Sequence, residues 1–404
     1  MNSPADCEVA IVGGGIVGTT LALLLVAQAR VRPGRVVLIE PAPAAGPLPG
    51  APIGLRVSAI APGSRARLAE LGVWQRLDAT RLCACEGMRV WHEAVPPDSP
   101  DVLVFDAAEA GEPDLGCIVE NAALQAALLE ACVERGIRVL SASLQGLRVT
   151  AQAAELELGN VLLRAELVVG ADGASSSARR LLQISATQQE YAQRAIVATV
   201  RGTRPHRRIA WQRFLATGPL ALLPLPGDAL SIVWSATETR AAALLALPPP
   251  QFNVALTAAS AGVLGELTLL SERAAFPLRR LAARRYVRPR VALVGDAAHV
   301  IHPLAGQGVN QGLEDAAALA AQLAARPAHE SPGAHAALLR YQRERRAGNA
   351  LMDGVVHGLD RLFTRPPGAV SAIAGAGMAL VARSPLARRL LVRQAAAGRP
   401  WPRR

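Results

Sequence analysis

Residues 7–18, Cys-Glu-Val-Ala-Ile-Val-Gly-Gly-Gly-Ile-Val-Gly, contain an apolar run followed by glycines at positions 13, 15 and 18. The run predicts a buried strand over 7–12, and the apolar stretch 16–29 predicts a helix. Residues 35–40 predict the next strand, so the chain opens with a strand–helix–strand unit. In such a unit Gly13 permits the turn, Gly15 lets the backbone approach a diphosphate, and Gly18 lets the helix pack on the strand.

This unit predicts a site for an adenine dinucleotide. The diphosphate would lie at the helix N-terminus, where free N–H groups and the helix dipole favour anions. Glu40 ends the second strand, where an acidic residue accepts the hydroxyls of an adenosine ribose. The unit alone does not separate FAD from NAD, and a glycine-rich turn without a ligand is the simpler alternative.

Two later segments have a similar layout. Residues 291–294 predict a strand that runs into Gly295-Asp296, a loop with glycines at 306, 308 and 312, and then an Ala-rich helix. This segment brings a carboxylate and a row of bare backbone amides to one place. Residues 166–169 predict a strand that leads into Gly170-Ala-Asp172-Gly173, although a carboxylate in such a turn can also simply stabilise the turn.

Composition narrows the function classes. The 404 residues include 43 basic residues, all arginine, and the net charge is +11. The arginines are spread through every segment without aromatic stacking groups, so nucleic-acid binding is not expected. Five cysteines without paired zinc-type spacing predict a reduced, cytoplasmic protein. His299 and His302 are three residues apart in a predicted loop without a carboxylate cluster, so no metal site is expected.

The predicted fold class is α/β: a Rossmann-like cofactor domain with an inserted β-sheet domain and a C-terminal helical tail. The expected division is 1–190 and 281–330 for the two parts of the cofactor domain, 191–280 for the inserted sheet, and 331–404 for the helical region. A few strands within 55–115 could belong to the substrate side. Further helices are predicted over 64–77, with Ser64 as N-cap, and over 121–135 and 251–261. Further strands are predicted over 137–140, 146–150, 155–158, 195–201, 220–225 and 230–236.

The three glycine turns, in this order, resemble the class A flavoprotein monooxygenases, which share the para-hydroxybenzoate hydroxylase fold. The similarity is strongest to the flavin-dependent ring hydroxylases of ubiquinone biosynthesis, and among these to the members that hydroxylate the prenylphenol ring at C5. It rests on 55–60 (Leu-Arg-Val-Ser-Ala-Ile), 71–74, 116–121, 295–310 and 391–395, and it covers nearly the whole chain.

The resemblance implies that the Rossmann-like cofactor domain is an FAD-binding domain and that the inserted β-sheet domain is the substrate domain. It also implies a set of cofactor contacts and a reaction. The reaction would be hydroxylation of a phenol ring through a C4a-hydroperoxyflavin, with FAD, NAD(P)H as electron donor, and O2. No catalytic side chain is needed, because the flavin carries the chemistry. Asp296 would bind the ribityl or diphosphate region, and the backbone of 303–310 would line the flavin ring. The predicted cofactor-binding residues are Gly13, Gly15, Gly18, Glu40, Arg56, Gln125, Asp172, Asp296, Pro303, Gly306, Gly308, Val309 and Asn310.

The substrate pocket is expected to come from the inserted sheet, and its lining candidates are Trp211, Phe214, Leu220, Leu222, Leu223, Pro224, Trp234 and Phe276. Core packing is the alternative role for each of them. A small soluble phenol is an alternative substrate, and a non-catalytic flavin-binding scaffold of a quinone-biosynthesis complex is an alternative function. Other quinone-biosynthesis proteins and a second copy of the chain are the expected protein partners.

The last residues carry a separate signal. From Arg383 onward there are seven arginines and no acidic residue, spread around leucines and Trp401. Such a tail either rests on an anionic membrane surface, at the inner face of the cytoplasmic membrane, or packs on the protein itself.

Overall fold

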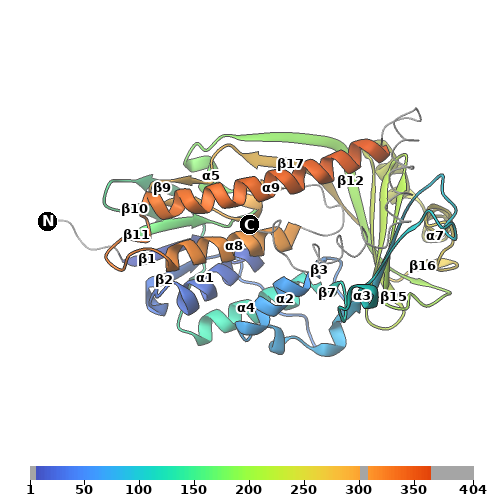
Figure 1. Ribbon diagram of the computed structural model, residues 1–404, viewed down its shortest axis with the longest axis horizontal. Helices are drawn as coiled ribbons and strands as arrows, with labels where there is room; N and C mark the ends of the chain where they lie inside the picture. The colour runs from blue at the N-terminus through green and yellow to red at the C-terminus, as the bar shows by residue number, and fades with distance from the viewer. Residues whose placement is uncertain (1–5, 301–307, 365–404) are drawn as a thin grey trace.

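The computed structural model describes residues 6–300 and 308–364. Figure 1 shows two sheets side by side, with long helices packed along one of them. The α/β class and the Rossmann-like first domain are confirmed.

The first sheet is built on the predicted opening unit. Strand β1 (Cys7–Val12) lies in the middle and pairs in parallel with β2 (Val36–Ile39) and β11 (Val161–Gly170). It is buried on both faces, as a parallel strand covered on each side must be. Helices α1 (Ile16–Gln28) and α4 (Asn121–Glu134) pack on one face. The remaining strands of this sheet are β8 (Arg138–Leu140), β9 (Gly146–Val149), β10 (Ala154–Leu158), β18 (Val287–Arg288) and β19 (Val291–Leu293).

The strand order explains why distant glycine turns meet. The path through the sheet is β18-β19-β11-β1-β2-β8. Strand β19 pairs in parallel with β11, and β11 pairs in parallel with β1. The three strands that precede the three glycine turns are therefore neighbours, and their carboxyl ends share one edge. Ligands of open α/β sheets bind at this edge.

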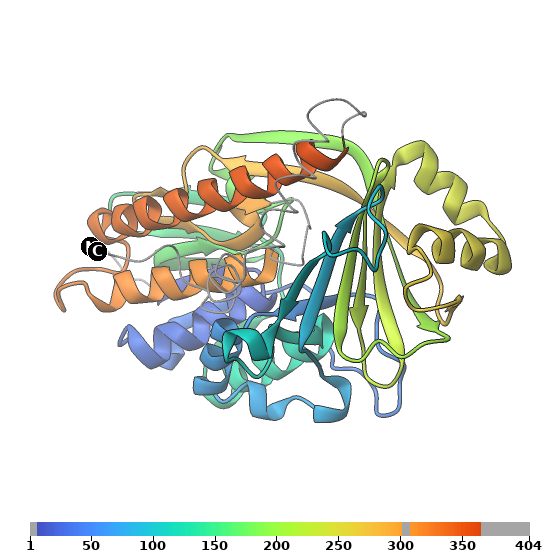
Figure 2. The ribbon, with the colours of Figure 1, turned by 45° about the vertical axis from the view of Figure 1, so that its right-hand side comes forward.

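The second sheet has nine strands in the order β20-β17-β12-β15-β14-β13-β5-β6, with β16 beside β12. Helices α6 (Glu238–Ala246) and α7 (Pro249–Ala259) cover one of its faces, and Figure 2 shows them at its outer side. Its strands are β5 (Gly87–His92), β6 (Leu103–Asp106), β12 (Ala186–Gly202), β13 (Ile209–Leu215), β14 (Gly218–Pro224), β15 (Ala229–Thr237), β16 (Leu267–Leu269), β17 (Ala274–Ala283) and β20 (His299–Val300). Strands β5 and β6 come from within 55–115.

A small three-stranded sheet connects the two larger ones. It is formed by β3 (Val57–Ile60), β7 (Gly116–Glu120) and β4 (Cys83–Cys85) in the order β3-β7-β4. Strand β7 runs directly into α4, and Arg56 immediately precedes β3. A short helix α3 (Ala107–Ala110) follows β6, and α5 (Ser177–Leu181) follows the Gly170–Gly173 turn.

Two predicted helix boundaries are wrong. The helix predicted over 64–77 is α2 (Pro62–Glu70), and its N-cap is Ala61, whereas Ser64 is buried in the first turn. Proline is favoured at the first helical positions, and Gly72 at φ 70° stops the helix early. Gly308 and Gly312, predicted in a loop, lie within α8 (Gly308–Ala324).

The predicted C-terminal helical region begins with α9 (His335–Thr364), which packs on α8. The arginine-rich tail lies outside the described residues. In residues 6–300 and 308–364, no helix combines the length and the apolar character needed to cross a bilayer.

Candidate functional site

The three glycine turns touch one another. Gly13 has φ 110°, and a Cβ on it would overlap the Ala171 carbonyl, so the first turn lies against the Gly170–Gly173 turn. A Cβ on Gly312 would come within 2.5 Å of Val17 Cγ2, and Gly295 contacts the same side chain. The absence of side chains therefore lets both later segments pack directly on the first strand–helix unit.

The N-terminus of α1 is open to an anion. Among the described residues no side chain caps it, and its first turn contains no acidic residue. Glu40 lies beside it: its carboxylate accepts hydrogen bonds from Gly14 N at 2.7 Å and from Ala42 N at 3.1 Å. A carboxylate has about four acceptor positions, so two remain for hydroxyl groups.

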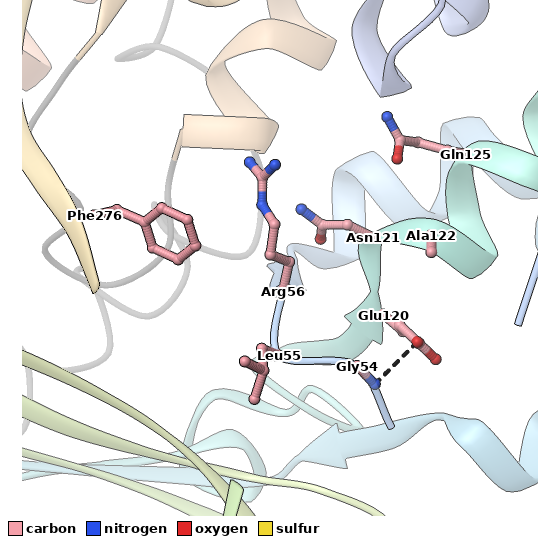
Figure 3. A pocket seen from close by; sticks show the side chains of 8 residues that line it. All are labelled: Gly54, Leu55, Arg56, Glu120, Asn121, Ala122, Gln125 and Phe276. Carbon is pink, nitrogen blue, oxygen red and sulfur yellow. Dashed lines mark hydrogen bonds between the residues drawn. The ribbon is translucent and has the colours of Figure 1, made fainter. Parts of the chain in front are cut away.

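A cavity of about 410 Å³ lies beside this helix end. Figure 3 shows the Arg56 side chain in it, between Phe276 on one side and Asn121 and Gln125 on the other. Among the described residues the exposed Arg56 guanidinium forms no hydrogen bond. The Gln125 amide nitrogen is 3.6 Å from the point where a Cβ of Gly15 would be. The full lining is Gly54, Leu55, Arg56, Glu120, Asn121, Ala122, Gln125 and Phe276.

Asp296 faces the same region. Its side chain is exposed to solvent, yet protein surrounds it on several sides, as at the bottom of a recess. Burial raises the pKa of this carboxyl, whereas the nearby charges of His299, Arg56 and Arg279 lower it. The Asp296 carboxylate is thus close enough to the Arg56 guanidinium of the cavity to be influenced by its charge.

Asp172 is used within its own turn. Its carboxylate accepts a hydrogen bond from Ser176 Oγ at 2.5 Å and another from Ala178 N at 3.1 Å. Ser176 is the N-cap of α5, so Asp172 stabilises the start of that helix. Its predicted contact with the cofactor stays a prediction.

The last predicted cofactor residues lie at the start of α8. The Asn310 side chain is buried, donates to Ala59 O at 2.8 Å and accepts from Ala61 N at 3.0 Å. It therefore ties α8 to β3, next to Arg56. Gly308 and Val309 belong to the same first turn. Pro303, Gly306 and His302 lie outside the described residues.

The structure places four of the predicted pocket residues away from the described cavity, and their contact with substrate stays a prediction. Leu222 and Trp234 are buried beneath α6 and α7, where Trp234 packs on Phe252 with ring centroids 6.1 Å apart. Trp211 packs against the same cluster, below the Arg89 guanidinium. Successive residues of a strand point to opposite faces, so Phe214 is on the other face, where it is 3% exposed. Phe276, another predicted pocket residue, lines the described cavity, and these four do not.

A cross-strand row links Phe214 to the cavity. Phe214 pairs with Pro219, while Ser235 pairs with Ala195 and Ala195 with Phe276. The β14–β15 register, extended by one residue beyond Leu220 and Trp234, brings Pro219 opposite Ser235. Residues paired in this way share one face. The face that carries Phe276 is therefore the one that reaches the cofactor side, and α6 and α7 cover the opposite one.

The sequence prediction missed Asp315. It is fully buried in α8 and binds His299 Nε2 at 2.5 Å and Arg345 Nε at 2.6 Å. Burial alone would raise its pKa, but the charges and hydrogen bonds of His299 and Arg345 outweigh this effect and lower the pKa. One available signal was an acidic residue on the apolar stripe of an amphipathic helix. In the described part of the chain, no group of three or more metal-binding side chains gathers.

These residues fit FAD. The open helix end suits a diphosphate and Glu40 suits a ribose, while the recess with Arg56, Gln125 and Asp296 offers both charges and an amide. The glycines leave room that a Cβ would fill. This donor and acceptor set matches a nucleotide cofactor that extends from the first turn toward Phe276.

Comparison with known proteins agrees with an FAD-binding site. The FAD binding domain family matches residues 6–353. The 3-demethoxyubiquinol 3-hydroxylase of Escherichia coli is 39% identical, over 88% of this chain and 89% of the relative. The ubiquinone hydroxylase UbiL of Rhodospirillum rubrum is 38% identical, over 96% and 89%.

Solved structures share the architecture. PqsL of Pseudomonas aeruginosa superposes with a TM-score of 0.72 at 25% identity, covering 92% of this chain and 99% of that chain. The p-nitrophenol 4-monooxygenase PnpA of Pseudomonas putida gives a TM-score of 0.74 at 18% identity, covering 98% and 99%, which shows the shared fold. The chain therefore belongs to the FAD binding domain family and is an FAD-dependent monooxygenase that hydroxylates aromatic rings.

Proposed function

We propose that this protein hydroxylates the ring of a prenylated phenol in ubiquinone biosynthesis, with NAD(P)H as electron donor and O2 as oxygen source. The names of its relatives support this substrate class, including the human ubiquinone biosynthesis monooxygenase COQ6, which is 32% identical over 88% of this chain. The observation that carries the proposal is the cavity in which apolar Leu55 and Phe276 face polar Arg56, Asn121 and Gln125.

Different residues would bind different parts of FAD along that cavity. The N-terminus of α1 would hold the diphosphate, Glu40 the adenosine ribose, and Asp296 and Gln125 the chain between diphosphate and ring. When bound, FAD supplies the activation of O2 and the transfer of one oxygen atom to the phenol ring. Arg56 would offset negative charge on the cofactor. Phe276 and the sheet face behind it would orient the phenol and keep water away.

The test uses purified protein loaded with FAD. A prenylated phenol should stimulate NAD(P)H oxidation and gain one oxygen atom. When ¹⁸O2 is supplied, the added atom should be ¹⁸O. Equal turnover of a short unprenylated phenol would favour the soluble-phenol alternative. Bound FAD without any substrate-dependent turnover would overturn the proposal and leave the flavin-binding scaffold.

The position of the new hydroxyl group is a separate question. The resemblance implies C5, whereas the name of the Escherichia coli relative specifies position 3. The C5 assignment stays a prediction, and an NMR assignment of the product decides it.

We further propose contacts beyond the substrate: other quinone-biosynthesis proteins, a second copy of the chain, and the inner face of the cytoplasmic membrane through the tail. Removing 383–404 should abolish co-sedimentation with anionic liposomes, and equal binding by both forms would exclude a role of the tail. Light scattering reports the oligomeric state. For the domains, we propose the predicted division, with β5 and β6 assigned to the substrate side.

A further inference from the structure

Within residues 6–300 and 308–364, Asp296 is held through its backbone and not through its side chain. Among the described residues its carboxylate makes no hydrogen bond, and it lies in a short 3₁₀ turn, Gly295–Ala297, that begins with Gly295 at φ 58°. Where this carboxylate points is therefore set by the turn. What fixes the turn also fixes the proposed contact between Asp296 and FAD.

Both ends of this turn are bound by one oxygen atom. Asp315 Oδ2 accepts a hydrogen bond from the backbone N–H of Gly295 at 2.9 Å and from His299 Nε2 at 2.5 Å. Gly295 precedes Asp296, and His299 follows it in β20. His299 also stacks on Tyr286 with ring centroids 5.8 Å apart, so the imidazole has little freedom to follow a moving partner.

The second oxygen atom connects the turn to α9. Asp315 Oδ1 accepts from Arg345 Nε at 2.6 Å and from Asn349 Nδ2 at 3.4 Å. Arg345 also donates to Asn349 Oδ1 at 2.9 Å. The carboxylate thus meets four donors, which uses its whole acceptor capacity. Arg345 supplies the compensating charge that a buried carboxylate requires.

We propose that Asp315 is a positioning residue: by binding Gly295 and His299 it holds the turn that presents Asp296 to FAD. The proposal rests on FAD binding beside Asp296 and needs no particular substrate. Asp315 does not reach the cavity itself, so it acts only through the turn.

The donor count explains why a carboxylate is needed. An asparagine at 315 has the same shape but turns an NH2 group toward one pair of donors. Either the Gly295 and His299 side or the Arg345 side would then face donor against donor. The Gly295–Ala297 turn would then lose the hydrogen bonds that hold it, although the rest of the α8 sequence is unchanged.

The experiment compares variants by FAD dissociation constant, visible flavin spectrum, flavin midpoint potential, and thermal stability of the FAD-free protein. Asp315→Asn and His299→Phe should weaken FAD binding by at least about tenfold and shift the spectrum and potential. His299→Gln keeps an N–H donor and should recover most of the affinity. Asp114→Asn is the matched control, because Asp114 is a buried carboxylate that binds Arg65 at 2.7 Å in another part of the molecule.

The control should lower thermal stability and leave the flavin readouts unchanged. Wild-type flavin affinity, spectrum and potential in both Asp315→Asn and His299→Phe would overturn the proposal. If Asp315→Asn does not fold, the two His299 variants decide alone: equal affinities would reject the role. All readouts are made without substrate, so failure of ring hydroxylation would leave their outcome intact.

Discussion

Gly18 faces the carbonyl oxygen of Gly13 so closely that any Cβ at position 18 would overlap it. The first turn of α1 is therefore in van der Waals contact with the loop before it, and this contact sets where the free N–H groups of the helix point.

The Gly18→Ala variant should lose FAD and be less stable by about 1–3 kcal/mol, because the added methyl group forces α1 away from the turn. Thermal unfolding and FAD titration measure both effects. Gly34→Ala is the control: a Cβ at Gly34 meets nothing within 4 Å, so stability should stay within about 0.5 kcal/mol. Normal FAD binding by the Gly18→Ala variant would show that close packing here is unnecessary.

The Asp296→Asn variant should bind FAD about ten to a hundred times more weakly, as expected for a lost hydrogen bond to a charged group worth about 1.5–3 kcal/mol. Its effect on the FAD-free protein has a defined sign. Burial raises the pKa of Asp296 in the folded state, so protonation favours folding and this contribution is lost as pH rises through the folded pKa. Lowering the pH from 7 should therefore stabilise wild type relative to Asp296→Asn in thermal scans. Unchanged FAD affinity in the variant would refute the central site assignment.

Replacing Arg56 by leucine should weaken FAD binding and raise the pH at which FAD affinity begins to fall. The reason is that Arg56 lowers the pKa of Asp296, so its removal lets that carboxyl become protonated at higher pH. FAD titrations between pH 5 and pH 8 give the midpoint. Arg148→Leu, at a side chain 77% exposed, should change neither quantity.

Truncation to alanine should change mainly the KM at Phe276 and mainly the stability at Phe252. Phe276 is 44% exposed and lines the cavity, so Phe276→Ala should raise KM for the phenol with a small loss of stability. Phe252 is fully buried under the sheet, so Phe252→Ala should cost about 3–5 kcal/mol. Steady-state kinetics and urea unfolding measure the pair. An unchanged KM in Phe276→Ala would remove Phe276 from the substrate site.

The five cysteines should resist alkylation in the folded protein. All are buried, and burial raises the pKa of both Cys7 and Cys132 to about 12, so almost no thiolate exists at pH 8. Reaction with a thiol reagent should need unfolding first and should follow the unfolding rate. Rapid alkylation of any one cysteine in the folded protein at pH 8 would contradict this prediction.

The opening unit could be predicted because its signals are local. The apolar run before Gly13 and the position of Glu40 depend only on residues within one strand–helix–strand unit. Helix α2 was misplaced because Ser64 and Pro62 both suit a helix start, and the chain uses proline.

The site was predicted only where its residues follow a strand end. Sheet pairing decides which face of β13 and β15 meets the cofactor side, and alternation alone does not, so the sequence could not show that Trp234 packs on Phe252. Asp315 was missed because its partners Gly295, His299 and Arg345 come together only when α8 and α9 pack.

Strand order also determines when the nascent chain can complete its sheets during synthesis. One edge of β1 pairs early with β2, but the other edge pairs with β11, which in turn pairs with β19. In the second sheet, β5 pairs with β13 and β17 with β20. Neither large sheet can be finished before about residue 300 has left the ribosome. Sheets closed by such distant segments fold slowly and expose unpaired strand edges meanwhile. The nascent chain therefore exposes unpaired strand edges, which favour aggregation, through most of its synthesis, and FAD can bind only once the third glycine turn has been made.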